Sequence, residues 1–230
     1  MTARRQPNAN SESVDNYLKA ILVLSGSEEH RVTSTALSDR LGVAPASVTN
    51  MLQKLAAGLP PLVEYERHHG VLLSVAGKRR ALEVVRHHRL IETFLYKVLD
   101  YPLEEVHEEA ERLEHFISER FEERIEAILG YPKMDPHGHS IPAMDGKMAK
   151  ENSIPLTQVA GKGTFVVNSI SDRDAAIVKL LRTSGIAPGV QLRLRNRHAD
   201  GGYIVSIGSS EQVLHLSREV GDAIRIHLSH

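Results

Sequence analysis

One acidic segment, Val106–His115, has the residue types and the spacing that a metal site needs. It reads V-H-E-E-A-E-R-L-E-H and contains His107, Glu111, Glu114 and His115. Successive spacings of four, three and one place these four side chains on one face of an α-helix. Imidazole and carboxylate groups together bind divalent transition metals. A charge-rich helix is more often a solvated surface, so the segment alone leaves both interpretations open.

Composition narrows the kind of metal and the kind of protein. The chain has 230 residues, of which 41% are hydrophobic and 25% charged, which is typical of a globular protein with two or more domains. It contains no Cys, so disulfides and thiolate ligands are excluded, and a metal would have oxygen and nitrogen ligands. No apolar run approaches the ~20 residues of a membrane span, and Met1–Ser13 lacks the apolar core of a signal peptide. We therefore expect a cytoplasmic protein without a membrane partner.

Charge is unevenly distributed along the chain. Residues 1–80 carry ten Lys and Arg against seven Asp and Glu, residues 81–130 carry six against thirteen, and residues 131–230 carry twelve against nine. An acidic block therefore lies between two mildly basic ones. A polyanionic partner is plausible only for the basic parts.

The first organised region, residues 14–76, has the pattern of a winged helix-turn-helix. Apolar residues at helical spacing predict a first helix, Thr33-Ser34 caps a short second helix that ends at Gly42, and Pro45 begins a third. Two short strands around Arg67–Gly70 then predict a hairpin wing. Residues 1–13 are polar, and we expect them to be a disordered tail.

The third helix of this region has a polar face suited to DNA. The side chains expected to contact phosphates and base edges in a major groove carry hydroxyl, amide or cationic groups and no negative charge. Arg67 of the wing is placed to reach the flanking backbone. The alternative is a protein-interaction module with the same three helices. The predicted DNA-contacting residues are Ser47, Thr49, Asn50, Gln53, Lys54 and Arg67.

Residues 77–132 are almost continuously helical in pattern. Two helices are predicted, from Lys78 to Val98 and from Leu103 to Leu129, separated by Asp100-Tyr101-Pro102. His88 and Glu92 share one face of the first. Two long amphipathic helices bury more apolar surface with a twofold partner, so we expect a homodimer.

The rest of the chain is predicted to be a linker, residues 133–155, and a small β domain, residues 156–230. His137 and His139 lie in the linker, and we interpret them as residues that only help to order it. Strands are expected at Thr164–Val167, Gln191–Arg195, Tyr203–Ile207 and Ala223–Leu228, with one helix at Asp174–Arg182. The fold class is therefore mainly α with a small β domain.

Three motifs in this order behind a winged helix carry a resemblance. They are R-H-H-R-L-I-E at 86–92, V-H-E-E-A-E-R-L-E-H at 106–115 and D-P-H-G-H-S-I-P at 135–142. The chain resembles the diphtheria toxin repressor family, which comprises iron-dependent repressors and manganese transport regulators. The resemblance covers nearly the whole chain. It implies a homodimeric, metal-activated transcriptional repressor of metal-uptake genes, with an N-terminal winged helix, a helical dimerisation and metal-binding domain and a C-terminal SH3-like β-barrel.

The resemblance also implies ligands. Glu111, Glu114 and His115 fall on the site that controls DNA binding, completed by the residue before Tyr17, which here is Asn16. A second ligand set consists of His88, Glu92 and His107. A carboxylate of the SH3-like domain can complete that set, and Asp174 is the nearest equivalent, with Asp172 as the alternative. Asp174 fits equally well as the N-cap of a helix.

Two departures bear on the choice of metal. Iron-dependent members have Cys where this chain has Glu111, and a harder carboxylate ligand favours Mn²⁺, with Fe²⁺ as the alternative. Manganese regulators have acidic residues where this chain has Asn16 and Lys19. An ammonium group opposes a second cation, so a closely spaced pair of manganese ions is not expected, whereas two separate sites are compatible with the sequence.

Two other classes of protein share some of these features. Carboxylates and histidines on paired helices also build di-metal enzymes, although those need Glu-x-x-His motifs in a four-helix core and leave the winged helix without a role. A metal-independent DNA-binding protein with a solvated acidic face is the other alternative. We predict a regulator and not an enzyme.

Overall fold

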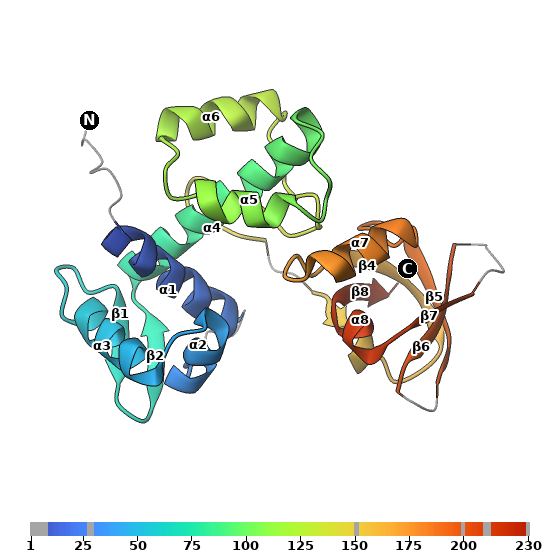
Figure 1. Ribbon diagram of the computed structural model, residues 1–230, viewed down its shortest axis with the longest axis horizontal. Coiled ribbons are helices and arrows are strands. Elements are labelled where there is room, and N and C mark those ends of the chain that lie inside the picture. Colours follow the sequence, from blue (N-terminus) through green and yellow to red (C-terminus); the bar gives the residue numbers. More distant parts are fainter. Residues whose placement is uncertain (1–8, 27–29, 150–151, 199–200, 209–212, 229–230) are drawn as a thin grey trace. The chain divides into compact units, whose positions relative to one another are not determined.

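The computed structural model describes residues 9–26, 30–149, 152–198, 201–208 and 213–228 (Figure 1). The chain divides into two compact units. Unit 1 comprises Met1–His88, Arg112–Glu122 and Pro142–Met148, and unit 2 comprises Arg89–Glu111, Glu123–Ile141 and Ala149–His230. Three of the divisions, after His88, Glu111 and Glu122, fall inside helices, and those after Ile141 and Met148 fall in connecting segments.

Unit 1 contains the predicted winged helix-turn-helix. Thr33 caps the second helix by accepting a hydrogen bond from Ala36 N, and Gly42 ends that helix with φ 64°, which L-residues rarely adopt. Pro45 lies in the first turn of the third helix, as predicted. The elements are α1 (Ala9–Ser25), α2 (Ser34–Leu41), α3 (Pro45–Ala56), β1 (Val63–Glu66), β2 (Gly70–Leu73) and the start of α4 (Val75–Val98).

The N-terminal tail is shorter than predicted. Helix α1 begins at Ala9, so residues 9–13 are helical and not disordered. Residues 1–8 of the predicted tail lie outside the described residues. The helix extends past the apolar stripe because Ser11 and Asp15 are both bonded to Arg80 of α4, at 3.0 and 2.5 Å.

One apolar core holds the winged helix together. Leu18 and Ile21 of α1, Leu37 of α2 and Val48 and Leu52 of α3 are completely buried in it. The wing strands pair antiparallel, from Val63 opposite Leu73 to Glu66 opposite Gly70. The backbone of Val32 joins them through two hydrogen bonds of 2.9 Å with Val71. The recognition helix α3 is thus fixed on its buried side, which leaves its polar side for a partner.

The second long helix predicted for residues 103–129 is wrong. The structure has two shorter helices, α5 (Val106–Leu113) and α6 (Glu119–Ile128). Ser118 starts α6, because its hydroxyl accepts a hydrogen bond from Phe121 N and its carbonyl accepts one from Glu122 N. The helix therefore restarts at an N-cap, and Glu114 and His115 lie just beyond the end of α5.

Unit 2 contains a six-stranded antiparallel sheet in the order β3-β8-β4-β5-β6-β7. The predicted strands and helix are present, whereas β3, β7 and the short α8 are not among the predicted elements. This sheet is the predicted small β domain. Its elements are β3 (Ile154–Pro155), a 3₁₀ turn (Leu156–Gln158), β4 (Gly163–Ile170), α7 (Ala175–Thr183), β5 (Gln191–Arg197), β6 (Tyr203–Ile207), β7 (Val213–Leu216), α8 (Arg218–Asp222) and β8 (Ile224–Leu228).

Part of the predicted linker is an ordered hairpin, residues 133–141. Met134 pairs with Ser140, and Ile141 N donates to Lys133 O at 2.9 Å. Ile170 N at the end of β4 donates to His137 O at 2.9 Å, which fixes the hairpin against the sheet. Gly138 has φ 89°, and a Cβ there would lie 2.3 Å from Asn168 O. Only glycine fits this approach, so the hairpin is part of the packed unit.

None of the helices in the described part of the chain is both long and apolar enough to cross a membrane.

Candidate metal centres and nucleic-acid interface

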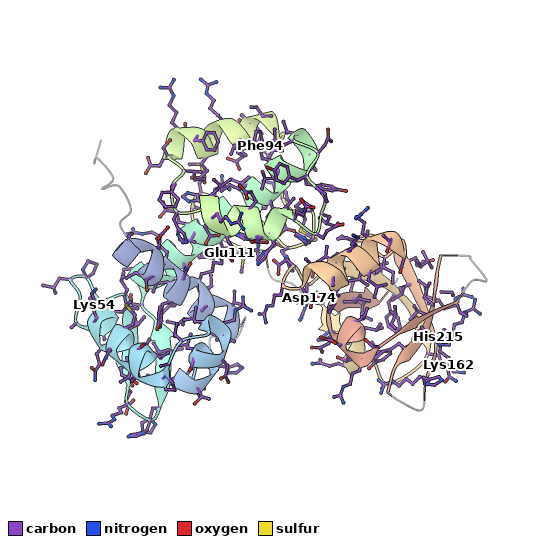
Figure 2. All side chains as sticks on the ribbon, viewed as in Figure 1. Lys54, Phe94, Glu111, Lys162, Asp174 and His215 are labelled. Atoms are coloured by element: carbon purple, nitrogen blue, oxygen red, sulfur yellow. The ribbon has the colours of Figure 1, made fainter. Side chains whose placement is uncertain are left out.

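Helix α3 presents the predicted DNA-contacting residues on its exposed side. Ser47, Asn50, Gln53 and Lys54 are exposed and Thr49 is half-buried, while Val48, Leu52 and Leu55 face the core. Figure 2 marks Lys54 on this helix. Arg67 is exposed in the wing. The arrangement leaves a polar surface without acidic side chains on α3, as major-groove readout requires.

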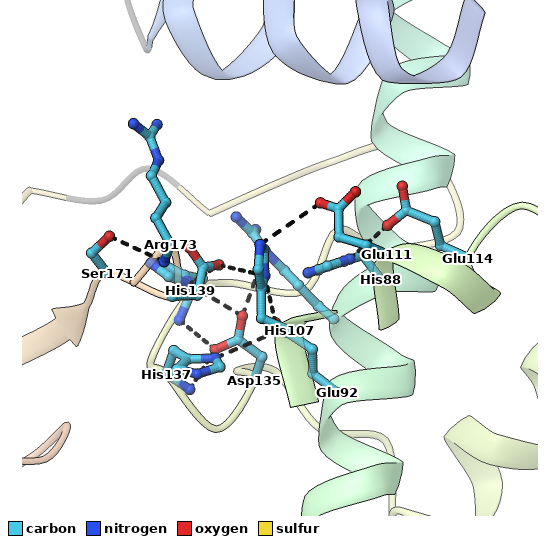
Figure 3. Close-up of polar contacts among 12 residues, drawn as sticks. His88, Glu92, His107, Glu111, Glu114, Asp135, His137, His139, Ser171 and Arg173 are labelled. Carbon is cyan, nitrogen blue, oxygen red and sulfur yellow. Dashed lines mark hydrogen bonds and ion pairs between the residues drawn. The ribbon is translucent and has the colours of Figure 1, made fainter. Parts of the chain in front are cut away.

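Unit 2 gathers carboxylates and imidazoles from three separate segments (Figure 3). Glu92 of α4 lies 3.2 Å from His107 Nδ1 on α5, and Asp172, which follows β4, lies 3.7 Å from the same nitrogen. Glu111 lies one turn after His107, with its carboxylate 3.8 Å from Nε2. The Glu92 side chain is completely buried. Elements far apart in sequence thus bring their ionisable groups to one place.

The hairpin of residues 133–141 adds three more groups to this cluster. His137 Nδ1 lies 3.6 Å from Glu92 Oε2, and His139 Nδ1 lies 3.3 Å from Asp135 Oδ2 and 3.7 Å from Asp172 Oδ2. The other oxygen of Asp135, Oδ1, fixes this side chain, because it accepts hydrogen bonds from the backbone N–H groups of His137 and His139 at 2.8 and 2.9 Å. The hairpin therefore brings an oxygen of Asp135 and the imidazole of His137 close to Glu92, and the imidazole of His139 close to Asp172.

Several of these buried atoms make no hydrogen bond within the described residues. They are both ring nitrogens of His137, Nδ1 of His139 and Oδ2 of Asp135. Glu92, Asp135 and His137 each offer one ligand atom within 4.8 Å of the others, and all three are buried. Buried polar groups normally have partners, and leaving one without a partner costs about 1–3 kcal/mol. A cation among these ligand atoms would supply the missing partner.

The charges in the cluster shift its pKa values in a consistent way. Burial alone would lower the pKa of His137, but the adjacent Glu92 carboxylate outweighs it and the pKa is raised. Burial would also lower the pKa of His139, but the adjacent Asp135 carboxylate raises it overall. Burial and the negative charge of Glu92 act to raise the pKa of Asp172. The nearby His139, His107 and His137 outweigh them, so the pKa is lowered overall. The carboxylates and imidazoles of this cluster therefore stabilise one another's charged forms.

Unit 1 contains a second group of buried ionisable residues around Glu114, and these have partners. Lys19 Nζ of α1 donates to both oxygens of Glu114, at 2.9 and 2.8 Å. His88 Nδ1 lies 2.6 Å from Glu114 Oε2. The Glu114 side chain is completely buried, which by itself raises its pKa, but His88 and Lys19 lower it overall. The Glu114 carboxylate is thus already neutralised by the chain.

Helix α1 makes two further polar contacts with residue 115. His115 Nε2 lies 3.1 Å from Asn16 Oδ1, and His115 Nδ1 lies 3.6 Å from Asp15 Oδ2. Burial acts to raise the pKa of Asp15, but His115 and Arg80 lower it. The predicted proximity of Asn16, Glu114 and His115 is therefore present in unit 1.

A third carboxylate of unit 1 is also paired. Arg86 Nε donates to Glu122 Oε1 at 2.5 Å, and His87 Nε2 lies 3.1 Å from Glu122 Oε2. Burial tends to raise the pKa of Glu122, and His87 and Arg86 together lower it. This pair joins α4 to α6 inside unit 1.

The predicted ligands belong to both units. Glu111 belongs to unit 2, whereas Glu114 and His115 belong to unit 1. Of the second set, Glu92 and His107 lie together in unit 2, while His88 belongs to unit 1 and contacts Glu114 there. Each predicted set is thus divided between the units.

The prediction for Asp174 is contradicted. Asp174 is exposed and caps α7, accepting hydrogen bonds from Ala176 N and Ile177 N at 2.8 and 3.0 Å (Figure 2). Asp172 lies in the cluster in its place. His137 and His139, interpreted from the sequence as loop-ordering residues, both face carboxylates. The neighbouring Asp135 in D-P-H-G-H was the signal that could have revealed them.

Known protein families match three successive parts of the chain. Residues 10–71 match the N-terminal DNA-binding domain of iron-dependent repressors, and residues 74–143 match the metal-binding and dimerisation domain of the same proteins. Residues 154–228 match the FeoA domain. The second match contains the candidate ligands of α4 and α5 and the hairpin of residues 133–141.

Individual relatives and a solved structure indicate the same family. The iron-dependent repressor IdeR of Mycobacterium leprae is 28% identical, over 94% of this chain and 96% of its own. The regulator MntR of Oceanobacillus iheyensis is 32% identical over 54% of this chain and 81% of its own. A solved manganese-dependent transcriptional repressor, in complex with manganese, superposes with a TM-score of 0.84 at 35% identity, over 93% of this chain and 99% of that one. The chain belongs to the iron-dependent repressor family.

Membership of this family confirms the predicted resemblance. It makes the chain a metal-dependent transcriptional regulator with a DNA-binding domain, and not an enzyme. The di-metal enzyme alternative is therefore not supported.

Proposed function

We propose that this protein is a metal-activated repressor that binds operator DNA as a homodimer in the cytoplasm, with Mn²⁺ favoured and Fe²⁺ as the alternative. The observation that carries the proposal is the buried cluster of Glu92, Asp135 and His137, whose ligand atoms lie within 4.8 Å of one another. Both ring nitrogens of His137 make no hydrogen bond within the described residues. The group therefore fits a divalent cation, which would supply positive charge to the carboxylates.

The ligand chemistry supports manganese over softer metals. Glu92, Asp135 and Asp172 offer carboxylate oxygens, His137 and His107 offer imidazole nitrogens, and the chain has no Cys. Carboxylates suit Mn²⁺, and imidazoles accept Fe²⁺ as well, so metal supply also decides occupancy. Glu111 and His139, beside this group, complete the proposed set.

The predicted ligands in unit 1 fit a metal less well. His115 and Asn16 are close to one another, but both oxygens of Glu114 already accept hydrogen bonds from Lys19. His88 also contacts Glu114. We therefore place the metal of the proposed function in unit 2.

Helix α4 links the metal cluster to the DNA-binding domain. It begins two residues after wing strand β2 ends at Leu73, and it carries Glu92 further along. Metal at Glu92 would favour those conformations of α4 that the metal-bound state needs, and so raise the population that binds DNA. The ion would act without touching DNA.

Exposed apolar side chains support a homodimer. In unit 1, Leu113, Phe116 and Phe121 are exposed, and in unit 2 Ile128 and Tyr131 are exposed. Exposed apolar side chains that follow one another closely along a segment are typical of protein–protein contacts. Two recognition helices related by a twofold axis would then contact the two half-sites of the operator.

DNA-binding measurements with and without metal test the proposal. A duplex selected from a random pool in Mn²⁺ is labelled, and binding is followed by fluorescence anisotropy in Mn²⁺, in anaerobic Fe²⁺ and in chelator. We expect tight binding only with metal, and loss of the metal response in His137→Ala. His227→Ala, which changes an exposed histidine of β8, is the matched control. Equal DNA binding in chelator would contradict metal activation and leave a metal-independent DNA-binding protein.

The same assay tests the recognition helix. Gln53→Ala and Lys54→Ala should each weaken binding while leaving the Mn²⁺ affinity of the free protein unchanged. Loss of an amide that contacts a base edge should weaken binding to one DNA sequence by about 1–3 kcal/mol. Loss of a cation that contacts a phosphate should weaken binding to all sequences and reduce the salt dependence of binding.

A further inference from the structure

Lys19 occupies the position of a metal ion with respect to Glu114. Its ammonium group lies at near-equal distances, 2.9 and 2.8 Å, from the two carboxylate oxygens, and 3.5 Å from His88 Nδ1. The Glu114 side chain is completely buried and that of Lys19 is 13% exposed. A buried carboxylate needs a nearby positive charge, and here the chain provides it.

A second cation at Glu114 would meet this ammonium group. Two positive charges within a few ångströms repel strongly where water is excluded. A metal would have to displace Lys19 before it could bind either oxygen of Glu114. The other contacts of α1 in this region are also internal, since Asp15 is paired with Arg80 and Asn16 with His115.

We propose that Lys19 is an internal cation that joins α1 to Glu114 in place of a metal ion. Unit 1 is then held together without metal, and the chain takes up its regulatory ion only at the cluster of Glu92, Asp135 and His137. The inference rests on the proposed function for that cluster, and it adds that the site around Glu114 takes no ion while Lys19 is present.

Substitution of Lys19 tests the inference through the number of bound ions. Mn²⁺ is titrated into the full-length protein by calorimetry. We expect one ion per chain for the wild type, and one more for Lys19→Glu, because the new carboxylate would face Glu114 and need a cation between them. Lys19→Arg keeps the charge and should bind the wild-type number. Lys54→Glu makes the same change of charge on the exposed face of α3 and is the matched control.

Thermal unfolding in chelator gives a second readout that needs no metal binding. Lys19→Met leaves Glu114 buried without its ammonium partner and should lower Tm by roughly 10 °C, whereas Lys54→Met should not. Mn²⁺ should raise the Tm of Lys19→Glu more than that of the wild type. If Lys19→Glu does not fold in chelator, the Arg and Met variants still decide the question.

The outcomes separate this inference from the proposed function. A wild type that binds no Mn²⁺ contradicts the proposed function, while the Tm of Lys19→Met in chelator still tests Lys19. A wild type that binds Mn²⁺ with the same number of ions as Lys19→Glu overturns the inference alone. An unchanged Tm for Lys19→Met overturns it as well.

Discussion

The two units differ in the cations beside their buried carboxylates. In unit 1, three carboxylates contact an imidazole and also a Lys or Arg side chain. Glu114 is bonded to Lys19, Asp15 to Arg80 and Glu122 to Arg86. In unit 2, the carboxylates of Glu92, Asp135 and Asp172 face imidazoles, with one guanidinium, Arg89, 3.6 Å from Asp135.

The kind of partner distinguishes a structural cluster from a binding site. Lys and Arg keep their charge at neutral pH, so a carboxylate bonded to one is already neutralised. Imidazole can lose its proton near neutral pH and then become a metal ligand. The same residue types on α4, α5 and α6 thus build a fixed joint in unit 1 and the proposed ion-binding cluster in unit 2.

The largest effect should come from removing an imidazole in unit 2. His137→Ala deletes a proposed ligand and should weaken Mn²⁺ binding by more than the roughly 100-fold that loss of an outer-shell partner causes. Calorimetry with Mn²⁺ measures it, with His227→Ala as control. Unchanged affinity would show that His137 only orders its hairpin, and the contrast between the units would fail.

Removal of a carboxylate in unit 1 should cost stability and not metal affinity. Glu122→Gln leaves Arg86, whose side chain is 5% exposed, without its charge partner, and should lower the free energy of unfolding by about 3 kcal/mol. Urea unfolding measures this loss, and Mn²⁺ titration should be unchanged. A loss of Mn²⁺ binding at intact stability would reverse the roles assigned to the two units.

The pH dependence of the same pair has a definite sign. The pKa of Glu122 is lowered below its ordinary 4.5, because His87 and Arg86 outweigh burial. Its contribution to stability is therefore complete above pH 4.5 and is lost as pH falls through the lowered value. The difference in unfolding free energy between wild type and Glu122→Gln should shrink as pH falls below 4.5. A difference that grows in acid would show that Glu122 has no lowered pKa.

A change at Gly138 should damage the metal cluster through the backbone. Gly138→Ala puts a Cβ within 2.3 Å of Asn168 O at a positive φ, which should cost about 2 kcal/mol. The hairpin would move, so Mn²⁺ affinity should fall together with stability. In unit 1, by contrast, Glu122→Gln should lower stability without changing Mn²⁺ affinity. Gly201→Ala, also at positive φ but with open space around it, is the control.

The smallest effects should separate two neighbouring aspartates. Asp172→Asn should weaken Mn²⁺ binding by about tenfold, because one neighbouring charge is lost. Asp174→Ala should cost about 1 kcal/mol of stability, the value of an N-cap, without changing Mn²⁺ affinity. Equal metal effects of both substitutions would contradict the assignment of Asp172 to the cluster.

Local patterns were sufficient to predict most of the fold. Caps such as Thr33 and Gly42 and the period of buried residues act over a few positions, so they are visible in one sequence. The break between α5 and α6 was missed, because the apolar pattern continues through it and the decisive signal is one hydroxyl, that of Ser118. Strand β7 was missed because its four residues, Val213–Leu216, are short and only partly buried.

The site was predicted in part, for a physical reason. Spacing along a helix groups His107 with Glu111, but it cannot show which groups approach from other elements. Lys19 was recognised as an opposing charge, yet its contact with Glu114 spans 95 positions and depends on tertiary packing. His137 and Asp135 reach Glu92 only because the hairpin docks against β4.

Asp135 uses its two oxygens for different purposes, and this affects how quickly the protein can respond. Oδ1 holds the backbone of His137 and His139, so the loop is ordered before an ion arrives. Capture of the proposed ion would then require little loss of chain entropy, and any proton on a ligating imidazole would have to leave. Occupancy can therefore follow a changing supply of metal without a slow refolding step.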